Sequence, residues 1–349
     1  MMGRKTVYND GLTSEQDWTV VNEENKRLLK EFIRYCTAND KSPKTCAQYE
    51  AQLKIFFCWN LKENKNKFFV DIKKRDLVSF FGWGRELGWS SCRLASFRAV
   101  LSSFSNFIER ILDEDYPTFR NIVKVLEPIH VENVREKTVV QEDEIISGME
   151  KLVERGEYQL ACFLALLASS GMRKSEAAQM KLEYFTDKKE IVFRGLAYIT
   201  PKIRTKGHGV KGKQISRYVF KENFDKYLNL WIKQREILNI KNEELFVVKG
   251  KTGYKAASSS IFTSWCEKIG KIIGVENLYA HSLRHYFATS LKKRGFPDSV
   301  VISIIQWNKG SGGAMLSIYD DRSSGEELDG FFANLKANTS SVKNEFLEE

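Results

Sequence analysis

The chain has 349 residues, of which 42% are hydrophobic, 29% are charged and only five are proline. This length is sufficient for two domains with separate cores, and the composition excludes an intrinsically disordered or fibrous chain. No apolar run approaches the roughly 20 residues that cross a bilayer, and the N-terminus lacks the apolar stretch of a signal peptide, so we expect a cytoplasmic protein. The six cysteines form no CxxC pair, which predicts buried, reduced thiols and neither disulfides nor zinc ligands.

The charge of the chain is strongly basic. Lysine and arginine number 55 against 45 aspartate and glutamate, which gives a formal net charge of +10. Such an excess favours a polyanionic partner, either nucleic acid or an anionic membrane surface. A basic surface that only maintains solubility is the alternative, and composition alone does not choose between these readings.

The first part of the chain predicts a helical domain. Residues 1–22 are polar, and we expect them to form a flexible segment. From 23 to 126, apolar residues recur at spacings of three and four, which predicts four helices. The second helix has the clearest start, because Ser42 suits the N-cap and Pro43 the first helical position. Residues 127–138 contain a proline, several charges and few apolar side chains, which is typical of a linker.

The rest of the chain predicts a mixed domain over residues 139–329. Residues 142–156 and 157–171 have helical patterns, and the second is apolar on nearly every side, so it belongs in a core. We expect a third helix to start in MRKSEAAQMKLEYF. The β-prone runs that follow it surround a Gly-rich turn and predict a small antiparallel sheet. Five further helical patterns complete the domain. The fold class is therefore mainly α with a small antiparallel β-sheet.

The segment RTKGHGVKGKQISR gathers basic residues at the predicted turn of this sheet. It contains three glycines and no acidic residue. Glycine lets the backbone approach a ligand closely and lysine supplies a mobile positive charge, so the segment suits contact with phosphates. A solvated loop is the alternative. The basic residues of this segment are Arg204, Lys206, Lys211, Lys213 and Arg217.

Two predicted helix starts carry further candidates. In GMRKSE, the positive helix end disfavours Arg173 unless an anion is close, and Glu176 could hold its guanidinium, although a surface ion pair is the ordinary interpretation. In AHSLRHYFATSLKKRG, His281 and Arg284 are three residues apart and share a face, whereas we expect His285 to lie nearer the apolar side. No HExxH motif or paired acidic cluster accompanies these histidines, so no metal site is predicted.

The order of these features resembles the tyrosine recombinases, also called phage-type integrases. The resemblance rests on the arginine of GMRKSE, a hairpin lysine, the His-x-x-Arg motif, a following tryptophan and a tyrosine near the end of the chain, and it covers about residues 23 to 325. It implies a helical, SAM-like core-binding domain over 23–126, a catalytic domain over 139–329 and a C-terminal tail over 330–349. In the family such tails often dock on a neighbouring protomer, and a disordered tail is the alternative. The two domains would form a C-shaped clamp around DNA.

The resemblance also implies a role for each site residue, and the implied catalytic residues are Arg173, Lys206, His281, Arg284, Trp307 and Tyr319. The arginines and the histidine would bind the scissile phosphate, the tyrosine would form a 3′-phosphotyrosyl link, and the lysine would protonate the leaving 5′ oxygen without any metal or cofactor. Glu176 and His285 would give structural support.

Two of these assignments stay open. Lys211 and Lys213 are alternatives for the lysine. Asn308 and Lys309 are alternatives for Trp307, because the following segment looks about three residues longer than is usual in the family.

The implied function is that of a site-specific recombinase, an integrase or transposase of a mobile element. Its partners would be double-stranded DNA, further copies of the chain from dimer to tetramer, and accessory DNA-bending factors, with no membrane and with a location at the nucleoid in a prokaryote. A type IB topoisomerase, a telomere resolvase and a non-catalytic DNA-binding regulator are the alternatives. The candidate DNA contacts are Lys44, Arg93, Arg98, Arg204, Lys211 and Lys213.

Overall fold

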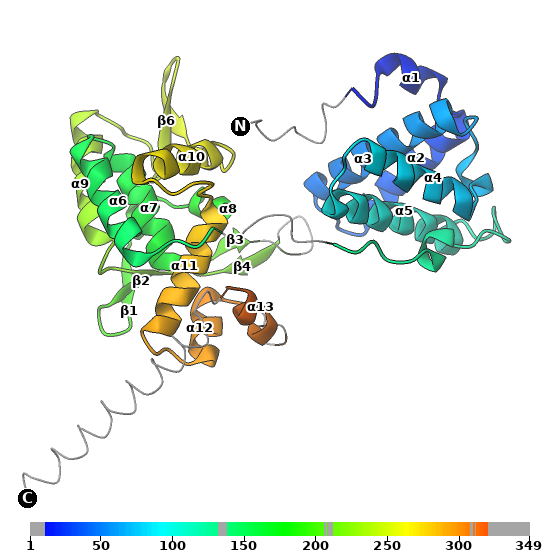
Figure 1. Ribbon diagram of the computed structural model, residues 1–349. Coiled ribbons are helices and arrows are strands. Elements are labelled where there is room, and N and C mark those ends of the chain that lie inside the picture. Colours follow the sequence, from blue (N-terminus) through cyan, green and yellow to red (C-terminus); the bar gives the residue numbers. More distant parts are fainter. Residues whose placement is uncertain are drawn as a thin grey trace, which may run out of the picture. The chain divides into compact units, whose positions relative to one another are not determined.

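The structure is a computed structural model that describes residues 11–131, 138–205, 207, 212–307, 310 and 312–319 (Figure 1). The chain divides into two compact units, one consisting mainly of the residues up to 135 and the other mainly of those from 136 onward. The start of the predicted flexible segment, residues 132–137 of the predicted linker and the predicted tail lie outside the described residues.

The first unit is helical, and its four long helices confirm the pattern read from the sequence. The Ser42 hydroxyl accepts a hydrogen bond from the backbone N–H of Thr45 at 3.1 Å, and Pro43 is the first helical residue, so the expected cap is present. The elements are α1 (Glu15–Val20), α2 (Glu23–Ala38), α3 (Pro43–Glu63), η1 (Phe69–Asp71), α4 (Lys74–Glu86), α5 (Ser91–Ile111) and η2 (Ile122–Val125).

Helix α1 is a difference from the sequence prediction, which made residues 1–22 flexible. The helix has six residues, which are too few to show a periodic apolar face. So short a helix depends on contacts with residues distant along the chain. It packs against α3, where Asp17 forms an ion pair of 2.8 Å with Lys62. Tertiary contact therefore orders a segment that local pattern left unassigned.

The core of the first unit is built largely from phenylalanine. Edge-to-face contacts between rings prevail, as between Phe69 and Phe104, whose centroids are 4.7 Å apart. Such rings bury large apolar areas and fix the angles at which the helices cross. Its fully or almost fully buried phenylalanines are Phe32, Phe56, Phe57, Phe69, Phe80, Phe97 and Phe104.

The second unit surrounds one central helix, as the sequence predicted. Every residue of α7 from Leu160 to Ser170 is buried, and α6, α9, α10 and α11 pack around it (Figure 1). The helices are α6 (Glu142–Glu154), α7 (Tyr158–Ser170), α8 (Lys174–Ala177), η3 (Leu182–Tyr184), α9 (Asp225–Ile237), α10 (Ile261–Ile273), α11 (Ala280–Lys293), α12 (Asp298–Ile305) and α13 (Gly312–Tyr319).

The helix predicted to start in MRKSEAAQMKLEYF is present as α8, but it is short and ends at Ala177 after a single turn. Gln179 and Met180, which follow shortly after the helix, make contacts with other segments. The amide of Gln179 pairs with both backbone groups of Arg204, and the carbonyl of Met180 accepts from the N–H of Leu245 at 2.8 Å. The Met180 carbonyl is therefore paired with Leu245 and not with the N–H of a continuing helix.

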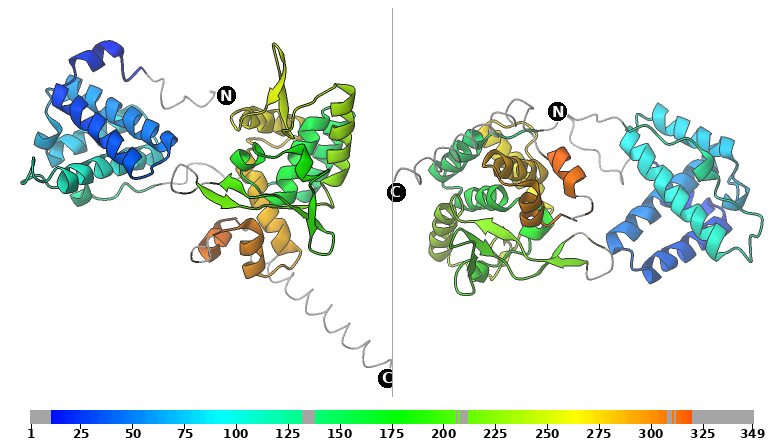
Figure 2. Two further views of the ribbon diagram at one scale, coloured as in Figure 1. Left: turned by 180° about the vertical axis from the view of Figure 1, so that it is seen from behind. Right: turned by 90° about the horizontal axis from the view of Figure 1, so that it is seen from below.

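The predicted small antiparallel sheet is present as separate pieces. One sheet has the order β1-β2-β5, a second pairs β3 with β4, and a third pairs β6 with β7, a hairpin that the sequence analysis did not predict (Figures 1 and 2). The strands are β1 (Glu190–Val192), β2 (Ala197–Ile199), β3 (Ile203–Thr205), β4 (Lys213–Ile215), β5 (Tyr218–Phe220), β6 (Val247–Gly250) and β7 (Gly253–Ala256).

The last helices form a small apolar cluster of their own. Helix α13 packs against both α11 and α12, and Leu316 of α13 lies in one cluster with Phe287, Ile305 and Trp307. This cluster attaches the end of the described chain to the helix that carries the His-x-x-Arg motif.

The cysteine prediction is correct for five positions and wrong for one. Cys36, Cys46, Cys58, Cys162 and Cys266 are buried free thiols, whereas Cys92 is exposed. In the described part of the chain, no helix is long and apolar enough to cross a membrane. Within the same residues, no group of three or more potential ligands is placed to hold a metal ion.

Candidate active site

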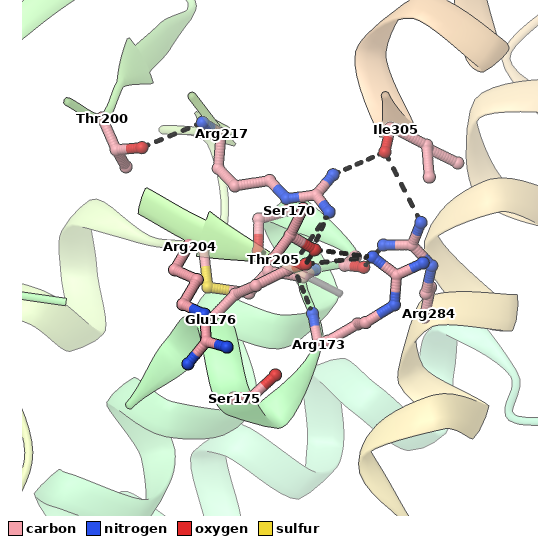
Figure 3. A network of polar contacts seen from close by, with 12 residues as sticks. Ser170, Arg173, Ser175, Glu176, Thr200, Arg204, Thr205, Arg217, Arg284 and Ile305 are labelled. Carbon is pink, nitrogen blue, oxygen red and sulfur yellow. Dashed lines mark hydrogen bonds and ion pairs between the residues drawn. The ribbon is translucent and has the colours of Figure 1, made fainter. Parts of the chain in front are cut away.

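A buried carboxylate lies at the centre of the candidate site. The Glu176 side chain has no exposed surface, and Figure 3 shows arginine and threonine side chains directed at it from several elements. One Nη atom of Arg173 lies 3.0 Å from Oε1, one of Arg217 lies 2.9 Å from Oε2, and the Thr205 hydroxyl donates to Oε1. The carboxylate therefore joins α8, β3 and the residue before β5.

These contacts decide the ionisation of Glu176. Burial alone would raise its pKa, but the charge of Arg217 and hydrogen bonds from Arg217, Thr205 and the Arg173 backbone lower the pKa to about 2. The carboxylate is consequently ionised at neutral pH, and the ion pair with Arg217 is shielded from solvent. The surface ion pair proposed from the sequence for Arg173 and Glu176 is wrong, since only Arg173 reaches solvent.

Arg173 holds one edge of its guanidinium against protein and keeps part of its side chain exposed. The same Nη atom that meets Glu176 lies 3.1 Å from the Thr205 hydroxyl, and the side chain is 32% exposed. The Glu176 carboxylate also accepts from the Arg173 backbone N–H at 2.8 Å, as in a capping box, so the anion required at this helix start is supplied by the chain.

Arg284 approaches from α11 and is 1% exposed. Its guanidinium donates to the carbonyl of Gly171 at 2.5 Å and to that of Ile305 at 3.5 Å. These carbonyls end α7 and α12, where helical partners are missing and partial negative charge accumulates. Figure 3 shows Arg173 and Arg284 directed toward the same region, so the structure brings together the two arginines predicted from the sequence.

Arg217 corrects the sequence analysis, which counted it with the basic hairpin. It is 0% exposed, and besides Glu176 it donates to the Ile305 carbonyl at 2.5 Å (Figure 3). Ile215, Arg217 and Val219 are all buried, whereas the residues between them are partly exposed. This alternation is typical of a strand with one buried face and could have identified an inward-facing arginine. The sequence prediction assigned Arg217 to the glycine-rich turn instead.

The predicted lysine hairpin is described only at its base. Thr205 ends β3 and lies opposite Lys213, the exposed first residue of β4, so Lys206 directly follows a residue bound to Glu176. Lys206 and Lys211 themselves lie outside the described residues. Arg204 is exposed, and its backbone N–H and carbonyl pair with Gln179 at 2.9 and 2.8 Å, a contact that the sequence analysis missed.

His281 lies at the start of α11, one turn before Arg284. Its side chain is exposed, and partial desolvation together with the charges of Arg284 and Arg173 lowers its pKa, so the imidazole is neutral at pH 7. His285 is buried, and its ring centroid is 5.3 Å from that of His281. The expectation that His285 lies nearer the apolar side is confirmed by its burial, and its ring still contacts that of His281 because residues four apart on a helix are neighbours.

Trp307 lies beneath Arg284. Its ring is buried, and the guanidinium carbon of Arg284 is 5.5 Å from the ring centroid, which is the geometry of a cation–π contact. Tyr319 is the last residue of α13, and its side chain lies outside the described residues. The alternatives Asn308 and Lys309 are also outside them.

The candidate DNA contacts in the first unit differ in their surroundings. Lys44 is exposed in the first turn of α3. The guanidinium of Arg93 stacks on Trp89 at 4.1 Å from the ring centroid, and Arg98 donates to the carbonyl of Leu126 at 2.7 Å. These two arginines of α5 therefore make packing contacts within the unit, which the sequence pattern did not indicate.

The sequence is similar to those of known proteins. Residues 138–324 match the model of the phage integrase family. The SPbeta prophage-derived recombinase-like protein YomM of Bacillus subtilis (strain 168) is 30% identical over 258 residues, which cover 73% of either protein. The tyrosine recombinase XerA of Pyrococcus horikoshii is 28% identical over 287 residues, covering 81% of this chain and 84% of that protein.

A solved structure shares the fold. The Tn1549 transposon integrase, in complex with a circular intermediate DNA, aligns with a TM-score of 0.63 at 14% identity, over 89% of this chain and 99% of that one. At this identity the likeness concerns the fold alone.

Gly171→Ala should destabilise the protein more than an ordinary glycine substitution. Gly171 has φ +57°, and an added Cβ would lie 2.5 Å from the ring of Phe287, so backbone strain and overpacking combine to a loss of roughly 2–4 kcal/mol. Gly156→Ala is the matched control, because Gly156 has φ +72° with nothing within 4 Å of an added Cβ. Equal losses in urea unfolding would contradict the packing argument.

Glu176→Gln should change how stability depends on pH. Because the folded pKa of Glu176 lies below its ordinary 4.5, the stability that its charge contributes is complete above about pH 4.5 and is lost toward about pH 2. The variant should be less stable by about 3–5 kcal/mol at neutral pH, with the gap closing in that acid window. Urea midpoints across the window test this, with the surface variant Glu243→Gln as control; a gap that is constant with pH would exclude the assignment.

Proposed function

This chain belongs to the phage integrase family, and from that premise we propose that it is a site-specific DNA recombinase of a mobile element. It cuts and rejoins DNA strands through a covalent link between Tyr319 and a 3′ phosphate. The observation that carries the proposal is that Arg173 and Arg284, from elements distant in the chain, are directed toward the same region (Figure 3). Arg173 is held there by the buried Glu176 carboxylate, and Arg284 by the carbonyls of Gly171 and Ile305. Such an arrangement holds two positive charges in place before any anion binds.

Two fixed arginines suit attack on a phosphodiester. The phosphate repels a nucleophile, and the transition state gathers further charge on the non-bridging oxygens. Guanidinium groups that are already oriented can donate paired hydrogen bonds to those oxygens without reorganising. His281 is neutral at pH 7 and supplies a further N–H donor beside the arginines.

The bond changes are assigned to a tyrosine and a lysine. The phenol oxygen of Tyr319 attacks phosphorus, the bond to the 5′ oxygen breaks, and Lys206 donates the proton that the leaving oxygen needs. The phosphotyrosyl link conserves the bond for rejoining, so neither ATP nor a metal is required. Two contacts support the assignment: α13 packs against α11, and Thr205, the residue before Lys206, is bound to Glu176.

Duplex DNA is the proposed partner, held mainly through phosphate contacts by both units of a chain with a net charge of +10. Assembly of two to four copies on DNA and action in the cytoplasm, at the nucleoid of a prokaryote, follow from the same proposal. The prophage and transposon origins in the relatives' names support a role in a mobile element. A type IB topoisomerase would use the same chemistry to relax DNA without exchange between two sites.

The first test is a covalent adduct that depends on Tyr319. Supercoiled plasmids carrying tiled fragments of the genome that encodes the chain are incubated with the protein, and DNA that remains attached in SDS is sequenced. We expect an adduct with the native protein and with the control Tyr254→Phe, but none with Tyr319→Phe. An adduct that persists in Tyr319→Phe would refute the nucleophile. Absence of any adduct would favour a DNA-binding regulator. Relaxation of the plasmids without strand exchange between two of them would favour a topoisomerase.

The second test distinguishes the hairpin lysines. On the mapped site, the scissile 5′ oxygen is replaced by sulfur, whose thiolate leaves without protonation because its pKa is much lower than that of an alcohol. Lys206→Ala should cleave the oxygen substrate at least about 100-fold more slowly than the native protein, and the sulfur substrate nearly normally. Lys211→Ala and Lys213→Ala are the matched comparisons. If the sulfur substrate restores cleavage by one of these two variants and not by Lys206→Ala, the lysine replaced in that variant is the proton donor.

A further inference from the structure

We propose that Arg217 is a positioning residue for cleavage, a role that rests on the function proposed above. Arg217 is fully buried, and both of its Nη atoms contact acceptors within the protein. The inference concerns what its two contacts hold: the Glu176 carboxylate at 2.9 Å and the Ile305 carbonyl at 2.5 Å.

These contacts close a ring of interactions. Arg173 is bound to Glu176, Glu176 to Arg217, and Arg217 to the Ile305 carbonyl. The Ile305 carbonyl also accepts a hydrogen bond from Arg284 (Figure 3). Arg284 donates in addition to the carbonyl of Gly171, which lies two positions before Arg173 in the chain. Arg217 thus connects the Glu176 carboxylate, which binds Arg173, to the Ile305 carbonyl, which binds Arg284.

The shape of the side chain explains why an arginine is required. Its planar guanidinium presents separate N–H groups in fixed directions, so Nη2 can meet the Glu176 carboxylate while Nη1 meets the Ile305 carbonyl. A lysine ammonium is a point charge on a flexible stem and cannot maintain both contacts at one separation. Losing either contact lets α12 move relative to α8, and with it the spacing between Arg173 and Arg284.

The consequence for catalysis lies in the precision of that spacing. Displacing a charge-stabilising group by about 1 Å can reduce a rate by about 100-fold while substrate binding, spread over many phosphate contacts, hardly changes. The ring also reaches the end of α12, from which the chain continues to Trp307 and α13. Arg217 therefore acts on the chemical step through the two arginines.

The test compares Arg217→Lys with Arg235→Lys, using the site mapped for the native protein. Arg235 is a matched control because it is also buried in the second unit and donates to backbone carbonyls, those of Asn242, Glu244 and Leu245, outside the ring. We expect Arg217→Lys to reduce the single-turnover cleavage rate about 10- to 100-fold, with the DNA dissociation constant changed less than about threefold. Arg235→Lys should leave the rate near that of the native protein.

A second substrate separates positioning from general damage. Replacing one non-bridging oxygen of the scissile phosphate by methyl removes the charge that Arg173 and Arg284 neutralise. On this neutral substrate the defect of Arg217→Lys should shrink to less than about threefold, since displaced arginines matter less there. A defect of equal size on both substrates, or a normal rate on the charged one, would overturn the positioning role while leaving the proposed function intact.

Two further outcomes have defined meanings. If Arg217→Lys does not fold, the paired change Arg217→Met with Glu176→Gln removes both buried charges, a replacement that proteins tolerate better, and the same substrate-dependent loss is expected. If the native protein itself forms no Tyr319-dependent adduct, the proposed function fails, and the role of Arg217 fails with it.

Discussion

A carboxylate removed from water must be neutralised by its surroundings, and the arrangement of the candidate site follows from how Glu176 meets that condition. Its side chain has no exposed surface, and donors come from Arg173, Thr205 and Arg217. An unpaired charge at such a position would cost several kcal/mol, so the partners cannot move away independently. One buried charge thereby fixes the end of β3, the start of α8 and the segment before β5.

The backbone supplies the second half of the arrangement. The carbonyls of Gly171 and Ile305 lie at the C-terminal ends of α7 and α12, where no further helical N–H is available. Buried guanidinium groups occupy them, so these orphan acceptors and the arginines satisfy each other. Every residue has a backbone carbonyl, so the amino-acid sequence does not reveal which carbonyls bind the arginines. In the sequence, these contacts are indicated only by the arginines and by the glycine at residue 171.

The two units differ in how they use their cations. In the second unit, buried arginines are held by acceptors and only Arg173 keeps a substantial exposed fraction among those that contact Glu176. In the first unit, Arg93 stacks on an aromatic ring and Arg98 binds backbone carbonyls, while Lys44 is exposed. Positive charge in the sequence is therefore divided between structural support and surface available to a polyanion, and only the contacts separate the two uses.

The sequence by itself determined the long helices, the central position of α7 and the resemblance that singled out six ordered site residues. Helix periodicity is a local property, and Ser42 before Pro43 or the apolar run of α7 requires no distant contact to be recognised. Tertiary structure alone decided that α8 ends after one turn and that α1 is ordered. It also decided that Arg217 is buried with Glu176, although the alternation from Ile215 to Val219 hinted at it. The reason is physical: a buried charge depends on partners far away in the chain, and local pattern carries no record of them.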